Sequence, residues 1–294
     1  MGIFKKYEDH RPEITGDERE KKGILLYFEL IKRKFWNYVE LNLLYFTTSL
    51  LSMAVYWAVL AGVIIPVIIS TISRESWKVW SDMNGGMPID KLQGSIIFYV
   101  ATIGSVLLVM LFGGGVCSAG YHYVLRNYTR QENAFIFSDY FEQTGKNFFQ
   151  ALIVSIIDTL LVCVCLFSIA AYYTMMKKDG SMVNILAFAV MLFVFFIYAV
   201  MHTYIWTMMI TFKISIWKIY KNALLLTFGA ALNSIGYIVC ASLFCALMIM
   251  FFAYMWIAAM GVLLFIGISA FNLLGHIFSY PVIKKYMIDN NNEN

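Results

Sequence analysis

The stretch from Val183 to Thr211, VNILAFAVMLFVFFIYAVMHTYIWTMMIT, contains no Asp, Glu, Lys or Arg. At about 1.5 Å per residue, a helix of this length exceeds the roughly 30 Å hydrocarbon core of a bilayer. The stretch therefore predicts a transmembrane helix. Similar apolar segments recur along the chain, and together they predict an all-α bundle with six spans, at residues 38–72, 94–118, 149–175, 183–211, 223–252 and 255–281.

The composition of the whole chain agrees with this prediction. Of the 294 residues, 61% are hydrophobic and 14% are charged, and the mean hydropathy is +0.71. Soluble domains are about 25% charged, so an integral membrane protein in contact with the lipid bilayer is expected. A disordered, fibrous or disulfide-stapled secreted protein is excluded. The five cysteines lie in apolar segments without metal-ligand spacing, so neither a metal site nor a cofactor is expected.

The basic residues are distributed unevenly between the two sides of the predicted bundle. With six spans, 17 of the 22 Lys and Arg residues lie on the side of both termini and five on the other. Because cytoplasmic loops carry an excess of Lys and Arg, both termini are expected in the cytoplasm. The net charge of +4 then marks the cytoplasmic membrane face, and no nucleic-acid partner is expected.

The chain is polar at both ends. Residues 1–22 predict a cytoplasmic tail without the apolar region of a cleavable signal peptide, and residues 286–294 predict a polar C-terminal tail. Residues 23–36 place apolar side chains such as Ile24 and Ile31 on one face of a helix. This pattern predicts an amphipathic helix in the membrane surface, and the alternative is that the segment extends the first span.

Two positions are expected to interrupt the predicted spans. Residues 38–72 are too many for one crossing, so this span must tilt, break or project, and Pro66 is where it can kink. The second span ends in Gly113, Gly114 and Gly115, which predicts a helix break inside the membrane. The alternative for these glycines is close packing of neighbouring helices.

Two of the predicted cytoplasmic loops resemble each other. Residues 137–147 and 212–222 both read Phe, eight further residues and Lys-Asn, and each loop leads into an apolar segment. The pattern indicates a parallel internal repeat, and the alternative is an amphipathic surface helix with a Lys anchor in each loop. In either case the loops are a candidate surface for docking another protein or anionic lipid, through Tyr140, Phe141, Lys146, Trp217, Tyr220 and Lys221.

Polar residues inside the spans are the candidates for a site. Asp158 and His202 each lie about nine residues from the cytoplasmic end of their spans, roughly 13 Å deep. The repeat makes Asn233 equivalent to Asp158, and Asn272 in the last span has a similar depth. Two interpretations remain open for this layer: a substrate or proton site, or hydrogen bonds that hold the helices together.

Four short stretches occur in the order found in one bacterial membrane-protein family. They are Leu41-Asn42-Leu43-Leu44, Ala119 to Arg126, Phe137 to Ala151 and Lys221 to Leu226. On these stretches residues 35–285 resemble the YesL family, a family of small bacterial membrane proteins. Residues 37–285 are then a YesL-like membrane domain. The chain departs from the family in its longer first external loop, residues 73–93, and in its Gly triplet, where relatives often have Pro.

The resemblance implies a location and a role rather than a reaction. The family has no established catalytic activity, and its members tend to be encoded beside carbohydrate ABC importers. The resemblance therefore implies a protein of the bacterial inner membrane that assists the permease or ATPase subunits of an oligosaccharide importer. A transporter acting alone is the alternative. No catalytic motif is visible, so no enzymatic activity is expected. The stretch Glu142 to Gly145 lacks the Ala pair of an ABC permease docking loop, so the chain is not expected to be such a permease itself.

Overall fold

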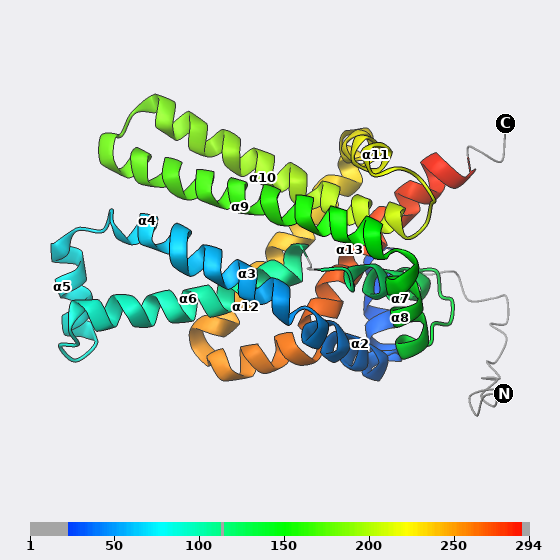
Figure 1. Cartoon of the computed structure of the whole chain (residues 1–294), viewed down its shortest axis with the longest axis horizontal. Helices are drawn as coiled ribbons and strands as arrows, with labels where there is room; N and C mark the ends of the chain where they lie inside the picture. The colour runs from blue at the N-terminus through cyan, green and yellow to red at the C-terminus, as the bar shows by residue number, and fades with distance from the viewer. Residues whose placement is uncertain (1–22, 113–114, 290–294) are drawn as a thin grey trace.

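The computed structural model describes residues 23–112 and 115–289, and every regular element in these ranges is a helix (Figure 1). The predicted all-α class is confirmed. The elements labelled η are π-helices. In chain order the elements are α1 (Ile24–Arg33), α2 (Phe35–Thr48), α3 (Leu50–Val59), η1 (Leu60–Ile64), α4 (Ile65–Ile69), α5 (Arg74–Met83), α6 (Ile89–Phe112), α7 (Ser118–Thr129), α8 (Ile136–Lys146), α9 (Phe148–Asp179), α10 (Met182–Met209), α11 (Ile216–Gly229), α12 (Ala231–Val262), η2 (Leu263–Gly267), α13 (Ile268–Ile283) and η3 (Lys284–Asp289).

Within the described ranges, five helical segments are long and apolar enough to cross a membrane, which supports the membrane class. The last of them is 59 residues long, and its backbone leaves helical geometry at Met255, with φ −142° and ψ 61°. Figure 1 shows the chain turning back within α12, so that α13 packs against the first part of α12. The five segments are Leu50–Ile69, Ile89–Met110, Phe148–Asp179, Met182–Met209 and Ala231–Asp289.

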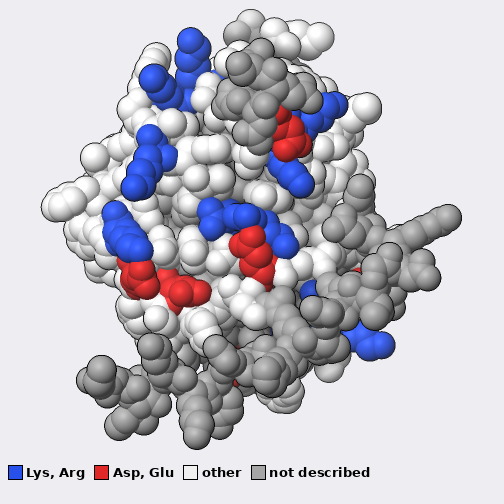
Figure 2. Space-filling view, turned by 90° about the vertical axis from the view of Figure 1, so that its right-hand side faces the viewer, with Lys and Arg blue, Asp and Glu red and all other residues white. Residues whose placement is uncertain are grey.

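The long helices run side by side along the molecule (Figure 1). The α9–α10 hairpin closes at Gly180, whose φ of 59° is a left-handed conformation that glycine adopts without steric cost. α3 packs on α6, and the short helix α5 connects this pair at the same end as Gly180. At the other end lie α1, α7, α8, α11 and η3, and this part of the molecule is called the basic end below. Lys and Arg side chains are spread over its face (Figure 2).

The centre of the fold is α13, nearly all of whose residues are buried against α2, α6, α7, α10 and α12. The adjoining π-helix η2 leaves backbone groups without their usual helical partners, and Asn42 on α2 satisfies them. Its amide nitrogen donates to the carbonyl oxygens of Leu263 and Leu264 at 2.8 and 2.7 Å. Its oxygen accepts from the backbone N–H of Ser269 at 2.6 Å. Asn42 therefore fixes α2 to the start of α13.

The first predicted span breaks at a different place from the one expected. The helix axis is interrupted at Ser49 (φ −91°, ψ 1°), between α2 and α3, whereas Pro66 lies inside a continuous helical segment. The π-helix η1 ends at Ile64, two residues before Pro66. A wider turn there accommodates a residue that has no N–H to donate. The break at Ser49 shortens the apolar segment to Leu50–Ile69, which matches one bilayer crossing.

The chain also leaves helical geometry between α6 and α7, as the break interpretation of the glycine triplet predicts. Gly113 and Gly114 lie outside the described residues, and Gly115 has a φ of 77°. The carbonyl oxygen of Gly115 accepts a hydrogen bond from the Ser155 hydroxyl at 3.0 Å. Non-helical backbone at membrane depth is tolerated where protein groups satisfy it, and Ser155 supplies such a group.

The segment predicted as a surface helix is α1, which is separate from α2 because the backbone breaks at Lys34 (φ −116°, ψ 31°). Tyr27 and Leu30 are buried, and α1 packs against α13. Leu25 and Phe28, by contrast, are more than half exposed. The helix thus has one apolar face on the protein and another that is free to contact lipid.

Candidate functional site

Asp158 lies on α9 and is almost completely buried, with 2% of its surface exposed. Its Oδ1 accepts hydrogen bonds from two tyrosine hydroxyls, that of Tyr198 on α10 and that of Tyr220 on α11, the latter at 2.9 Å. A buried carboxyl group is costly unless polar partners surround it. The two hydroxyls provide these partners, so three helices meet at one acidic side chain.

His202 lies one turn after Tyr198 on α10, so both face Asp158. The His202 Nε2 is 3.3 Å from Asp158 Oδ2 and accepts a hydrogen bond of 2.8 Å from the indole N–H of Trp206. Phe112 packs edge-on against the His202 ring at 5.5 Å between centroids. The group Asp158, Tyr198, His202, Trp206 and Tyr220 is called the Asp158 cluster below.

Hydrogen bonding in the Asp158 cluster leaves one carboxyl oxygen without a donor. An indole N–H can only donate, so His202 Nε2 uses its single lone pair on Trp206. Asp158 Oδ2 faces the same nitrogen and has no hydrogen-bond partner of its own among the described residues. The Asp158 cluster therefore contains a buried carboxyl oxygen whose hydrogen bonding is incomplete.

A second polar group, which we call the histidine pair, lies next to the Asp158 cluster. His122 on α7 and His276 on α13 are both buried, and His122 Nδ1 lies 2.9 Å from His276 Nε2. The other nitrogen of His276 contacts the Thr207 hydroxyl at 3.1 Å. The His122 ring stacks on Trp206, with centroids 5.1 Å apart and an interplanar angle of 20°. Trp206 thus connects the histidine pair to the Asp158 cluster.

The sequence does not predict a role for the histidine pair. Counting residues along uninterrupted spans places His122 and His276 near the cytoplasmic interface and outside the layer of Asp158. The break between α6 and α7 makes His122 part of a separate helix packed against α13, so counting along the span misplaces it. In the sequence, the histidine pair is indicated by the polar residue His276 within the apolar stretch that forms α13.

Asn272 belongs to the same region. Its amide donates to the carbonyl oxygens of Met110 at 2.9 Å and Ile268 at 3.0 Å. Together with His122, His202 and His276 it lines a cavity of about 10 Å³. This volume is about what one water molecule needs, so the cavity has room for a water and not for a sugar.

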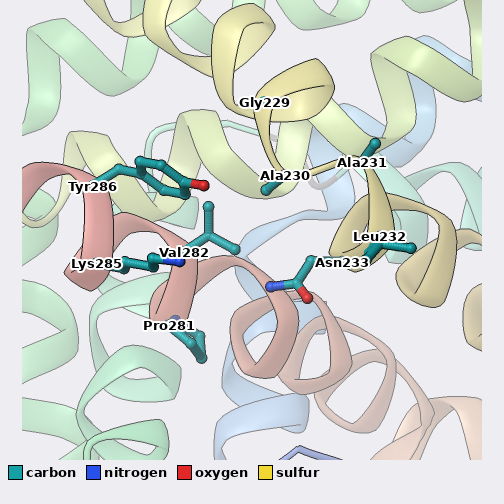
Figure 3. Close-up of a pocket in the computed structure, with 9 residues that line it drawn as sticks. All are labelled: Gly229, Ala230, Ala231, Leu232, Asn233, Pro281, Val282, Lys285 and Tyr286. Atoms are coloured by element: carbon teal, nitrogen blue, oxygen red, sulfur yellow. The ribbon is translucent and has the colours of Figure 1, made fainter.

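Asn233 is not part of this region. It lies in the first turn of α12, it is exposed, and it lines a larger hollow beside Lys285 and Tyr286 (Figure 3). The equivalence with Asp158 fails because the helix after the second loop breaks at Ala230 and not at Asn222. Asp158, in contrast, lies about three turns into α9, which begins directly after Asn147.

The predicted docking residues also separate into two sets. Tyr140 is fully buried and its hydroxyl bonds the Thr48 hydroxyl at 2.6 Å, whereas Tyr220 belongs to the Asp158 cluster. Tyr140 is therefore not presented to a partner, which corrects the expectation for this residue, and Tyr220 is partly buried with its hydroxyl turned to Asp158. Phe141 is 53% exposed and Trp217 is 78% exposed. The exposed set, called the loop surface below, consists of Phe141 and Lys146 on α8 and of Trp217 and Lys221 on α11.

Metal chemistry has no visible basis in the part of the chain that the structure describes. In residues 23–112 and 115–289, no group of three or more His, Cys, Asp and Glu side chains could hold a metal ion. The cysteines at 117, 163, 165, 240 and 245 are free thiols.

Comparison with known protein families gives a match to part of the chain. The model of a family described as a protein of unknown function, DUF624, matches residues 93–169, which include His122, Tyr140 and Asp158. No curated protein and no solved structure matches the chain. YesL proteins contain the DUF624 domain. The match over residues 93–169 is therefore consistent with the resemblance to the YesL family seen in the sequence.

Proposed function

We propose that this chain is a non-catalytic accessory or regulatory partner of an oligosaccharide ABC importer in the inner membrane of a bacterium. The observation that carries the proposal is the loop surface, where Trp217 and Phe141 expose large aromatic side chains beside lysines. Exposed aromatic residues near the centre of a contact are typical anchors of protein interfaces. The nature of the partner is inferred from the YesL resemblance.

The size of the internal space supports a partner role over sugar transport by the chain itself. The cavity beside the Asp158 cluster measures about 10 Å³, whereas pockets for small-molecule ligands measure about 300–1,000 Å³. This cavity is thus too small to hold a sugar, which favours a role that depends on the surface of the molecule.

The proposed topology has six crossings with both ends of the chain in the cytoplasm. The reversal at Met255 supports two crossings within the last apolar segment. The gathering of Lys and Arg at the basic end supports its cytoplasmic placement, because cytoplasmic segments carry such an excess (Figure 2). In this topology the loop surface faces the cytoplasm, where the ATPase subunits of an importer lie.

Affinity purification from native membranes in mild detergent tests the proposal. We expect permease or ATPase chains to co-purify with the wild-type protein, and the double variant Trp217→Ala, Phe141→Ala to lose most of them. Trp256→Ala on α12 is the matched control, because Trp256 is 58% exposed but lies far along the chain from the loop surface. Recovery of this chain alone, under conditions in which the importer subunits stay together, would contradict the proposal.

A second candidate function rests on the Asp158 cluster, namely a proton-coupled transporter acting alone. Buried ionisable groups inside a membrane bundle are costly, and they often mark ion or proton pathways. On this account Asp158→Asn would abolish proton-driven uptake and leave folding intact, and His202→Gln would have the same effect. Full uptake in both variants would remove this candidate.

A further inference from the structure

A hollow of about 480 Å³ opens at the basic end, between the α11–α12 corner and the junction of α13 with η3 (Figure 3). The corner forms because the backbone leaves helical geometry at Ala230, with φ −113° and ψ 47°. A second hollow of about 470 Å³ adjoins the first and shares Asn233, Pro281 and Lys285 with it. The volume of each hollow is in the range of ligand-binding pockets.

Three hydrogen-bond donors from two distant parts of the chain meet at the first hollow. Figure 3 shows the Lys285 amino group, the Tyr286 hydroxyl and the Asn233 amide around the same space. No acidic residue lines this hollow, and within the described ranges Lys285 takes part in no ion pair. The N-terminal end of α12 adds a partial positive charge, which comes from the backbone N–H groups that precede the first intrahelical hydrogen bond. This first bond runs from the N–H of Ser234 to the carbonyl oxygen of Ala230. The hollow is therefore suited to an anion.

The surroundings of the hollow favour an anion that carries apolar chains. Leu232, which lines it, is 87% exposed and lies at the start of an apolar segment long enough to span a membrane. Such exposure is typical of a side chain that faces lipid tails. Asp289 lines the second hollow and does not line the first one.

We propose that the first hollow binds the phosphate headgroup of an anionic phospholipid, with Lys285, Tyr286 and Asn233 as its donors and Leu232 beside the acyl chains. The inference stands apart from the importer proposal, because it concerns different residues and requires no protein partner. An anionic lipid bound there would connect α12 to the C-terminal end of α13 and so stabilise the last helical hairpin.

The test uses the full chain in nanodiscs of phosphatidylcholine, alone or mixed with phosphatidylglycerol. Native mass spectrometry counts retained phosphatidylglycerol, and thermal unfolding follows stability. A basic residue near an anionic surface contributes about 1 kcal/mol, which corresponds to roughly fivefold in affinity. We therefore expect Lys285→Gln to retain about fivefold less phosphatidylglycerol, and Lys285→Arg to retain nearly the wild-type amount. Lys178→Gln, at the opposite end of the molecule, is the matched control and should behave like wild type.

A second variant and a measurement with inorganic phosphate distinguish lipid binding from misfolding and from a free phosphate site. Tyr286→Phe removes only a hydroxyl, so it tests the same site if Lys285→Gln unfolds in phosphatidylcholine alone, and it should also lower phosphatidylglycerol retention. Inorganic phosphate should not raise the melting temperature of the wild type. Equal phosphatidylglycerol retention by the wild type, Lys285→Gln and Tyr286→Phe would overturn the proposal. Stabilisation by inorganic phosphate that depends on Lys285 would overturn the lipid assignment in favour of a free phosphate site.

Discussion

His202 Nε2 lies 3.3 Å from Asp158 Oδ2, and the two side chains belong to α10 and α9, the two helices of one hairpin. Trp206 holds the histidine from one side, and the hydroxyls of Tyr198 and Tyr220 hold the carboxyl group from the other. The most polar part of the interior is therefore also the point where α9, α10 and α11 are joined. Its contribution to stability and its contribution to function can be measured separately.

The first prediction separates charge from hydrogen bonding at Asp158. Asp158→Asn keeps an oxygen that accepts from Tyr198 and Tyr220, so we expect the free energy of unfolding to change by less than about 1 kcal/mol. Asp158→Ala leaves two buried hydroxyls without an acceptor, at a cost of about 1–3 kcal/mol for each. Melting curves in detergent measure both variants. An alanine variant as stable as the asparagine variant would show that these hydrogen bonds do not stabilise the fold.

The second prediction concerns the histidine pair. His122→Leu and His276→Leu should each destabilise the protein, because each leaves the partner nitrogen buried and unpaired. The double variant should cost less than the sum of the two, with a coupling energy of about 0.5–3 kcal/mol. Unfolding of the four proteins in detergent gives this coupling energy. Additive losses would mean that the two rings do not interact in the folded protein.

The third prediction compares Gly120, at the contact of α7 with α8, with Gly145, which is exposed on α8. A Cβ on Gly120 would lie 2.0 Å from the carbonyl oxygen of Tyr140 and 2.6 Å from Thr144 Oγ1, so Gly120→Ala must push the helices apart. We expect a loss of about 3 kcal/mol. Gly145→Ala is the matched control, because a Cβ there meets nothing within 4 Å. Replacing this helical glycine should stabilise α8 by about 0.5–1 kcal/mol. Equal melting temperatures for the two variants would contradict the close packing of α7 on α8.

The fourth prediction tests the orientation in the membrane. In a background with the five native cysteines replaced by alanine, single cysteines at Asp82, Lys218 and Lys284 are exposed to labelling. A membrane-impermeant maleimide should label the Asp82→Cys variant in intact cells. It should label the Lys218→Cys and Lys284→Cys variants only after the membrane is opened. Labelling of the Lys284→Cys variant in intact cells would place the end of α13 outside and rule out six crossings with cytoplasmic ends.

Much of the architecture could be predicted because membrane helices are specified by local composition. The segment predicted at 183–211 is α10, Met182–Met209, and the one at 149–175 is α9, Phe148–Asp179. Depth counting along these two uninterrupted helices also predicted that Asp158 and His202 lie in one layer, and the structure brings them into contact. The method works where the helix runs without a break.

The method fails where the backbone leaves the helix at a place that local composition does not mark, in contrast to the break at the glycine triplet. The corner at Ala230 removes Asn233 from the layer, and the break at Ser49 was expected at Pro66. Tyr140 looked like a surface residue because its helix is amphipathic, but α8 packs between α7 and α2 and buries it. These outcomes depend on contacts between distant segments, which one sequence does not reveal.

Oligosaccharide uptake in the host cell tests most directly whether the chain assists an importer. Uptake of a labelled oligosaccharide is compared in the parent strain, in a strain without this chain, and in a strain that has the chain but lacks the importer ATPase. The account predicts reduced uptake without the chain, restored by the wild type and by Asp158→Asn, and no uptake without the ATPase. Uptake that continues without the ATPase and stops in Asp158→Asn would contradict it, because the chain would then transport the sugar alone.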